Sequence, residues 1–261
     1  MLKNKKFKIL SIDGGGILGL YSSEILKYIK DELLNGKQFS DEFHLITGTS
    51  TGGIIALALA IGCQPEDISN FYKEYGVKIF PSWKRLLFKM PLLSHKYSNQ
   101  ALSEALTTIF KDLTIADCKT LVCIPAIDIS NCQPVVFKTN NSGGQTREIN
   151  TKLKDIALAT SAAPTYFPIH SFDHYSGLVD GGLWQNNPAL CGIIEAANHF
   201  VGEGKEYQSM KILSIGNPLS GIRNSIPTRT KNSSLLKWNS QLVLLPMKIT
   251  SLGTHEMIKI I

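Results

Sequence analysis

The sequence predicts an α/β fold, with three layers (α/β/α), a mostly parallel central sheet and a serine at a strand-to-helix elbow. Short runs of aliphatic and β-branched residues alternate along the chain with longer stretches of helical periodicity. Two strand-to-helix junctions, at residues 13–16 and 48–53, are rich in glycine. A strand that leads through a tight turn into a helix is the repeating unit of parallel sheets with both faces covered.

The first half of the chain contains two such units. A strand rich in β-forming residues is predicted at 7–12, and a helix with regularly spaced apolar residues at 21–34. A second strand is predicted at 43–47, and a strongly apolar helix follows at 54–61. A further helix is expected at 65–75, because proline followed by two acidic residues is typical of a helix N-terminus.

The second half continues the alternation. Helices are predicted at residues 99–110, 152–160 and 189–200. Strands are predicted at 121–129, 133–138 and 210–215, with a short apolar strand at 178–179. The strands at 121–129 and 133–138 are expected to pair antiparallel. Residues 221–234 resemble a linker, and residues 256–261 have an apolar helical pattern without a stop signal. We therefore expect a single catalytic domain over 1–261 whose C-terminal end is truncated.

The composition of the 261 residues excludes several classes of protein. With 43% hydrophobic and 18% charged residues, the chain can form a large core and is not a disordered protein. Its net charge of +6 suits an acidic membrane surface or nucleic acid, or simply a slightly basic protein. The five cysteines are scattered and include no C-x-x-C pair, so neither a disulfide framework nor a zinc site is expected. No segment has the pattern of a signal peptide or a membrane-spanning helix.

The sequence Gly48-Thr49-Ser50-Thr51-Gly52 matches the pattern G-x-S-x-G between a predicted strand and a predicted helix. In such an elbow, the sharp turn holds the serine in a strained conformation, and the glycines let two backbones approach closely. The positive end of the following helix faces the serine, where negative charge develops during the reaction. We interpret Ser50 as a nucleophile; the alternative is a glycine-rich turn that happens to carry a serine.

Gly14, Gly15 and Gly16 form another loop between a strand and a helix. We favour an oxyanion hole, in which backbone N–H groups bind the charged oxygen of a tetrahedral intermediate. A nucleotide loop is the alternative, because Gly19 completes the spacing G-x-G-x-x-G, but no acidic residue follows at the end of a second strand. A P-loop is excluded because no Gly-Lys-Ser/Thr follows. A plain turn is the third interpretation.

A serine nucleophile needs a base, and the histidines offer no strong candidate. Only His199 and His255 follow Asp180, as the order Ser–Asp–His of a triad requires. His199 falls inside a predicted helix and His255 lies near the end of the sequence, so we expect structural roles for both. Asp180, by contrast, ends a short apolar strand and precedes Gly181 and Gly182, which places a carboxylate on a tight loop.

Taken together and in this order, the glycine motifs resemble those of the patatin-like phospholipase family. The motifs are Asp13-Gly14-Gly15-Gly16, Gly48-Thr49-Ser50-Thr51-Gly52-Gly53 and Asp180-Gly181-Gly182. Residues 159–168 and 186–189 also resemble the family, and the resemblance extends over about 6–216. Because three separate motifs agree in order and context, the match is specific.

This resemblance implies a lipid acyl hydrolase with a patatin-like fold, whose Ser–Asp dyad works without a histidine, a metal or another cofactor. Carried over to this sequence, Ser50 is the nucleophile, Asp180 is the base and the first glycine loop is the oxyanion hole. The sequence departs from the family at Leu18, where members usually have a basic residue. A positive charge near the loop is thereby lost.

The implied substrate is a membrane phospholipid or another acyl-ester lipid, bound by a cytoplasmic protein in peripheral contact with the membrane. No nucleic acid polymer is implied. Residues 79–97 mix basic side chains, among them Lys84, Arg85 and Lys89, with bulky apolar ones. This mixture suits an anionic lipid interface, and the alternative is an ordinary surface subdomain.

Two other functions remain open at this stage. Some bacterial proteins similar to this one degrade membranes in defence against phage when a cyclic nucleotide activates them. A second alternative, of a different class, is a regulatory module that binds a nucleotide through the glycine loops and hydrolyses nothing. Labelling of Ser50 by a fluorophosphonate distinguishes an enzyme from such a module.

Overall fold

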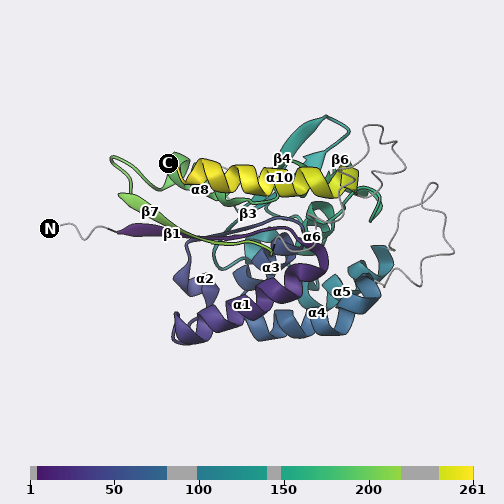
Figure 1. Cartoon of the computed structure of the whole chain (residues 1–261), viewed down its shortest axis with the longest axis horizontal. Helices are drawn as coiled ribbons and strands as arrows, with labels where there is room; N and C mark the ends of the chain where they lie inside the picture. The colour runs from purple at the N-terminus through teal and green to yellow at the C-terminus, as the bar shows by residue number, and fades with distance from the viewer. Residues whose placement is uncertain (1–4, 81–98, 140–147, 219–240, 261) are drawn as a thin grey trace, which may run out of the picture.

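The computed structural model describes residues 5–80, 99–139, 148–218 and 241–260, and it arranges them as a sheet between two layers of helices (Figure 1). The sheet has seven strands in the order β5-β6-β3-β2-β1-β7, and β4 also pairs with β3. Four neighbouring strands are parallel to one another: β1 (Lys6–Ile12), β2 (Leu45–Gly48), β3 (Leu121–Asp128) and β7 (Ser209–Ile215). The predicted α/β class is confirmed.

Antiparallel pairs extend the sheet beside β3. Strands β4 (Gln133–Lys138) and β6 (Tyr175–Asp180) both pair antiparallel with β3. The short β5 (His170–Phe172) pairs antiparallel with β6. The predicted antiparallel pairing of residues 121–129 with 133–138 is therefore confirmed, whereas the sequence analysis missed β5 because three residues carry no periodicity.

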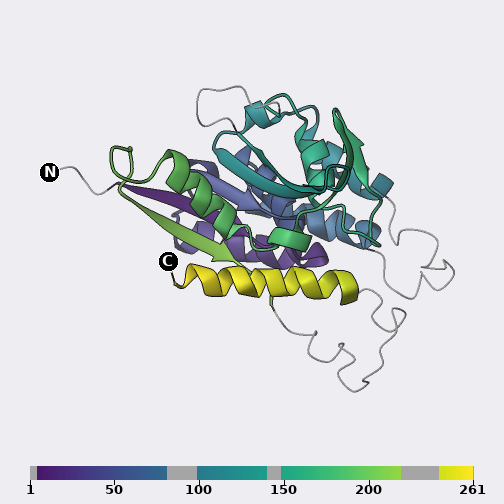
Figure 2. The same ribbon diagram turned by 90° about the horizontal axis from the view of Figure 1, so that it is seen from above.

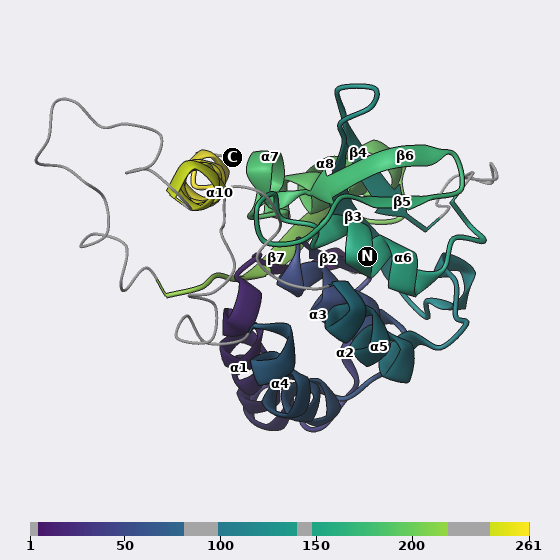
Figure 3. The ribbon, with the colours of Figure 1, turned by 90° about the vertical axis from the view of Figure 1, so that its right-hand side faces the viewer.

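The helices form two layers (Figure 3). One layer contains α1 (Gly19–Glu32), the short α2 (Phe39–Glu42), α3 (Thr51–Ala60), α4 (Pro65–Ile79), α5 (Asn99–Phe110) and α6 (Leu153–Thr160). The other contains α7 (Gly182–Gln185), α8 (Ala189–His199) and α10 (Gln241–Ile258). Two single turns of 3₁₀ helix, η1 (Gly16–Leu18) and η3 (Ile115–Asp117), complete the described helices.

The core lies on both faces of the sheet, as the apolar strands require. Along β1, Phe7 and Ile9 pack in a cluster beneath α8, whereas Leu10 and Ile12 belong to the larger cluster on the other face. This alternation follows from the two-residue period of a strand, so a strand buried on both faces has few polar positions. Every residue of α3 is buried, which explains why this helix is apolar all round.

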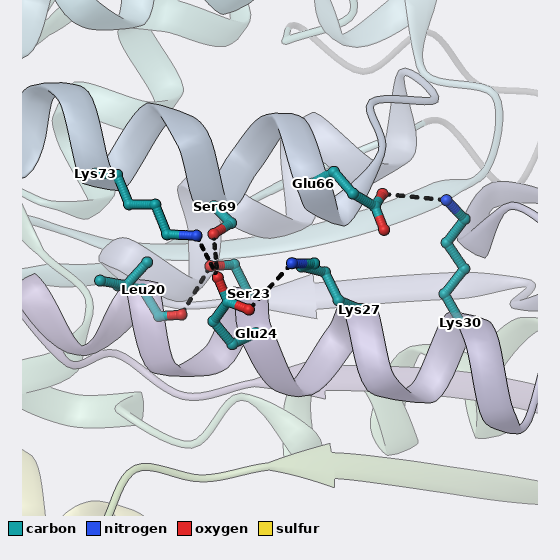
Figure 4. Close-up of polar contacts among 8 residues, drawn as sticks. All are labelled: Leu20, Ser23, Glu24, Lys27, Lys30, Glu66, Ser69 and Lys73. Carbon is teal, nitrogen blue, oxygen red and sulfur yellow. Dashed lines mark hydrogen bonds and ion pairs between the residues drawn. The ribbon is translucent and has the colours of Figure 1, made fainter.

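Helices α1 and α4 lie side by side and are joined by polar contacts (Figure 4). Glu24 of α1 accepts hydrogen bonds from Ser69 and Lys73 of α4, and the Lys73 ion pair is 2.8 Å long. Near the other end of the interface, Lys30 and Glu66 pair at 3.1 Å. The Lys73 ammonium, followed by the Ser69 hydroxyl, lowers the pKa of Glu24 to about 2. These contacts hold α1 against α4, and α4 supplies Phe71, Tyr72 and Ile79 to the cavity described below.

Helix α10 lies along α7 and α8 (Figure 2), and it is much longer than the sequence pattern at 256–261 indicated. The predicted lipid-facing segment at 79–97 falls almost entirely on residues 81–98, outside the described residues, as does the linker-like segment at 221–234. Among the described residues, no helix combines the length and apolar character that crossing a membrane requires.

Candidate active site

Ser50 lies at the turn between β2 and α3, in a conformation that side chains rarely adopt. Its φ and ψ are 54° and −125°, and it is the residue immediately before α3. Such a left-handed conformation costs about 1–3 kcal/mol and persists only where its surroundings enforce it. Here the turn brings the serine to the positive end of a ten-residue helix, as the sequence analysis predicted for the elbow.

The Ser50 hydroxyl donates a hydrogen bond of 2.6 Å to Oδ2 of Asp180, which is the last residue of β6. The other carboxylate oxygen, Oδ1, accepts the backbone N–H of Gly182 at 2.7 Å. Ser50 is 7% exposed and Asp180 is fully buried. The structure thus brings together two residues 130 positions apart, in the geometry that direct proton transfer from serine to aspartate needs.

Burial raises the pKa of Asp180 from 3.8 to about 7, against the opposing effects of the Ser50 hydroxyl and the Gly182 N–H. Removing a carboxylate from water disfavours its charged form, and two hydrogen-bond donors restore only part of that loss. A carboxylate with a pKa near neutrality is a much stronger base than an ordinary aspartate. The same burial therefore makes Asp180 suited to accept a proton.

Two asparagine side chains fix the glycine loop by hydrogen bonds to its backbone. The carbonyl oxygen of Gly14 accepts Nδ2 of Asn217 at 2.9 Å and Nδ2 of Asn186 at 3.3 Å. Because a peptide group is planar and trans, fixing the Gly14 carbonyl turns the Gly15 N–H to the opposite side. A Cβ on Gly14 would lie 3.1 Å from the Ser50 Cβ, so this peptide adjoins the nucleophile.

The three glycines of this loop do not contribute equally. The N–H of Gly14 donates to the Asn186 carbonyl at 3.0 Å, which corrects the expectation that it is an oxyanion donor. Within the described residues, no acceptor lies opposite the N–H groups of Gly15 and Gly16. Gly16 has a φ of +57°, a conformation that glycine adopts without strain. The geometry thus reduces the predicted donors to Gly15 and Gly16.

Thr160 is a site residue that the sequence analysis did not identify. Its hydroxyl accepts the backbone N–H of Ser50 at 3.0 Å and donates to the carbonyl of Pro125 at 2.6 Å. The Ser50 N–H therefore already donates a hydrogen bond, and the Thr160 hydroxyl links the elbow to β3. Thr160 belongs to a segment that resembles the patatin-like family, but a lone threonine at a helix end gives no signal of this role.

The supporting glycines occupy points of close approach. A Cβ on Gly52 would lie 2.2 Å from the Ile12 carbonyl oxygen, and a Cβ on Gly48 would lie 2.1 Å from the Gly52 carbonyl oxygen. Gly181, directly after Asp180, is equally close to the backbone of β3, and Gly182 supplies the N–H that Asp180 accepts. The glycine motifs therefore allow three backbone segments to meet at the dyad.

Neither histidine considered as a base contacts the dyad in the described residues. His199 lies on α8, 3.6 Å from Glu195, and away from the cavity. His255 does line the cavity, on α10. A second buried carboxylate, that of Asp13, accepts a hydrogen bond from Ser251, and its Oδ1 atom is buried without a partner. Burial raises the pKa of Asp13 to about 7.

A cavity of about 820 Å³ opens onto Ser50 and Asp180. Its walls are mainly apolar and come from both helix layers. The apolar lining comprises Ile17, Leu18, Ile54, Phe71, Tyr72, Ile79, Phe80, Leu102, Tyr166, Phe167, Val243, Leu244, Met247 and Leu252. A cavity of this size and polarity suits a small-molecule ligand with a long apolar part.

Helix α10 supplies one wall of this cavity, which the sequence analysis also missed. Met247 and Thr250 contact Gly182, beside the dyad, and Ser251 contacts Asp13, beside the glycine loop. The helix follows residues 219–240, which carry no motif, so nothing in the sequence indicated that it returns to the site.

Comparison with known proteins agrees with this geometry. A family model described as patatin-like phospholipase matches residues 10–190. The chain belongs to the patatin-like phospholipase family. This is a family of serine acyl hydrolases, which favours an oxyanion hole over a nucleotide loop at the first glycine motif.

Relatives of this patatin-like chain occur in plants and bacteria. It is 32% identical to patatin-like protein 3 of Arabidopsis thaliana, over 88% of this chain and 62% of that relative. It is 36% identical to the cGAMP-activated phospholipase of Vibrio cholerae, over 82% of this chain and 65% of the relative. The chain thus spans less than two thirds of the length of these curated relatives. The crystal structure of VipD from Legionella pneumophila matches at a TM-score of 0.45 and 12% identity, over 69% of this chain and 46% of that one.

Proposed function

We propose that this chain is a phospholipase A-type lipid acyl hydrolase that cleaves acyl esters of membrane lipids through a dyad of Ser50 and Asp180. The observation that supports it most strongly is the 2.6 Å hydrogen bond from the Ser50 hydroxyl to a buried carboxylate. Family membership and the largely apolar cavity beside that hydroxyl agree with a substrate that has acyl chains.

In the first step, Ser50 Oγ forms a bond to the ester carbonyl carbon while its proton passes to Oδ2 of Asp180. The carbonyl oxygen becomes an oxyanion, which the N–H groups of Gly15 and Gly16 stabilise together with the positive end of α3. When the intermediate collapses, the ester C–O bond breaks and the departing alcohol takes the proton from Asp180. An acyl-enzyme remains.

In the second step, water attacks the acyl-enzyme carbonyl and gives a proton to Asp180. Collapse of the second intermediate releases the fatty acid and returns the proton to Ser50 Oγ, which restores the resting site. No histidine takes part, so the proton affinity of Asp180 itself must suffice. Its pKa, raised from 3.8 to about 7 by burial, makes the carboxylate a stronger base by roughly three powers of ten than an ordinary aspartate.

The test uses three variants, one of them a matched control. Ser50→Ala and Asp180→Asn should each lower ester hydrolysis by about 100- to 10,000-fold. Asp128→Asn makes the same chemical change at a carboxylate that is 1% exposed and holds the turn after β3, away from the cavity, and should retain activity. A fluorophosphonate should label Ser50 in wild type. Wild-type-like hydrolysis by Asp180→Asn would refute the dyad.

Activation by a cyclic dinucleotide is a second proposal, and it concerns regulation of the same chemistry. Two relatives, from Vibrio cholerae and Escherichia coli, are named cGAMP-activated phospholipases and are 36% and 35% identical to this chain. If this chain is regulated in the same way, hydrolysis of phospholipid vesicles should depend on added cGAMP. Full activity without any nucleotide would exclude this regulation and leave the dyad proposal intact.

A further inference from the structure

We propose that Lys248 binds the phosphodiester of the lipid substrate inside the catalytic cavity and thereby sets a preference for phospholipids over neutral lipids. This inference rests on the proposed function, because it concerns the substrate of the same site.

Lys248 is placed on the cavity wall by two contacts on either side of it along α10. Met247, the residue before it, packs against Gly182 next to the dyad. Ser251, three residues later, donates a hydrogen bond to Asp13, the residue before the glycine loop. Positions separated by three residues lie on one side of a helix, and both Lys248 and Ser251 line the cavity. Lys248 therefore lines the cavity from the part of α10 that lies between a contact beside the dyad and a contact beside the glycine loop.

The charge of Lys248 is not balanced within the described protein. It is the only lysine or arginine among the described residues that line the cavity. The two carboxyl groups there, those of Asp13 and Asp180, owe their pKa shifts to burial and to nearby hydroxyl and N–H donors, with no contribution from Lys248. No ion pair joins Lys248 to any residue in the described ranges. An anionic ligand would supply the missing counter-charge.

The surroundings of Lys248 also disfavour leaving its charge unpaired. The side chain is half-buried, and burial alone lowers its pKa. A cation that has lost part of its hydration gains most from an anion that enters the same space. Leu18, which also lines the cavity, provides no charge. Lys248 is thus the cation that the described cavity offers to a substrate.

The polarity of the wall favours a phosphodiester over other anions. Along α10, the first cavity residues, Val243, Leu244 and Met247, are all apolar. The polar cavity residues Lys248, Ser251 and His255 all follow them, with Leu252 as the one apolar residue among them. A phospholipid has the same order, with acyl chains on one side of the ester and a charged phosphodiester a few bonds away on the other. A fatty acid carries its charge on the carboxylate at the former ester carbonyl, beside Ser50, and has no second anionic group a few bonds further on.

The experiment compares two substrates with identical acyl chains, a phosphatidylglycerol and a diacylglycerol, in micelles of a neutral detergent. Lys248→Met keeps the length of the side chain but removes its charge, and Lys248→Arg keeps the charge. Lys259→Met is the matched control, because Lys259 directly follows the same helix, pairs with Glu256 at 2.8 Å and is 56% exposed. Inorganic phosphate is tested separately as an inhibitor of diacylglycerol hydrolysis.

Lys248→Met should lower kcat/KM for the phospholipid by about 10- to 100-fold, as loss of a charge-assisted hydrogen bond does, and change diacylglycerol hydrolysis by less than about twofold. Lys248→Arg should restore most of the phospholipid activity, and Lys259→Met should behave as wild type. An equal loss on both substrates, or no loss on either, would overturn the proposal. The proposal would also be overturned if Lys248→Met lost inhibition by phosphate but hydrolysed the phospholipid like wild type, because Lys248 would then bind free phosphate and not the lipid. If wild type hydrolyses neither lipid and Ser50 resists the fluorophosphonate, the proposed function itself fails.

Discussion

Ester hydrolysis should rise steeply with pH close to neutrality, because the proposed base is a buried carboxyl group. Only ionised Asp180 accepts the Ser50 proton, and burial raises its pKa from 3.8 to about 7. With that pKa, about a tenth of the molecules carry an ionised Asp180 at about pH 6 and about nine tenths at about pH 8. The value of kcat/KM should therefore increase roughly tenfold over this interval, with its midpoint near pH 7.

The assay measures kcat/KM for a neutral, soluble p-nitrophenyl ester between about pH 5 and about pH 9 at constant ionic strength. Such a substrate does not titrate, so the profile reports groups of the free enzyme. Asp13 has a pKa raised to a similar value, and the variant Asp13→Asn therefore serves as the control. Persistence of the midpoint in Asp13→Asn supports Asp180 as its source. A midpoint near pH 4 would refute the reasoning, and a profile flattened in Asp13→Asn would assign the midpoint to Asp13.

Three further changes test the packing around the dyad. The unfolded chain loses the Asp13 proton near pH 4 but the folded chain only near pH 7, so ionisation of Asp13 lowers stability as the pH rises through this window. Asp13→Asn should therefore gain up to about 4 kcal/mol of unfolding free energy relative to wild type between about pH 4 and about pH 8, as measured by urea unfolding; a pH-independent difference would contradict this. Thr160→Val removes the acceptor of the Ser50 N–H, so it should lower the free energy of unfolding by about 1–3 kcal/mol in the same assay and should also lower kcat. Thr160→Ser keeps the hydroxyl and should retain the wild-type stability and kcat. Gly52→Ala would bring a Cβ to 2.2 Å from a carbonyl oxygen and should prevent folding or lower the melting temperature sharply, whereas Gly253→Ala, with its nearest neighbour at 3.9 Å, should be neutral or stabilising.

The positions of Ser50 and Asp180 at glycine-rich junctions could be predicted from the sequence, whereas the role of Asp180 as the base came from the resemblance to the patatin-like family. Asp180 ends a short apolar strand and Ser50 follows one by two residues, both beside glycines. Such a junction requires both a close backbone approach and a sharp turn. Strands with regular patterns, such as β1 and β2, were predicted close to their observed bounds for the same reason. The local sequence contains the physical constraint in each of these cases.

The residues that support the dyad could not be predicted, because their roles depend on contacts between distant segments. Thr160 acts through one hydroxyl at the end of α6, and Asn217 through one amide 203 positions away from Gly14. Nothing around either residue distinguishes it from other polar residues at the end of an element. The same is true of α10, whose approach to the site depends on a path through residues without a motif. The prediction that Gly14 is an oxyanion donor was wrong, because its N–H donates to the carbonyl of Asn186, and no local pattern in the sequence indicates that contact.

The contact between Asp13 and Ser251 joins residues 238 positions apart, and the dyad joins residues 130 apart. Closing such long loops costs chain entropy that only the packing of intervening elements offsets. A partly folded chain that has formed β1, β2 and α3 therefore has a serine but neither its base nor the far wall of its cavity. Hydrolytic activity accordingly reports that folding is complete. During synthesis, the dyad and both walls of its cavity can come together only after almost the whole described chain has been made.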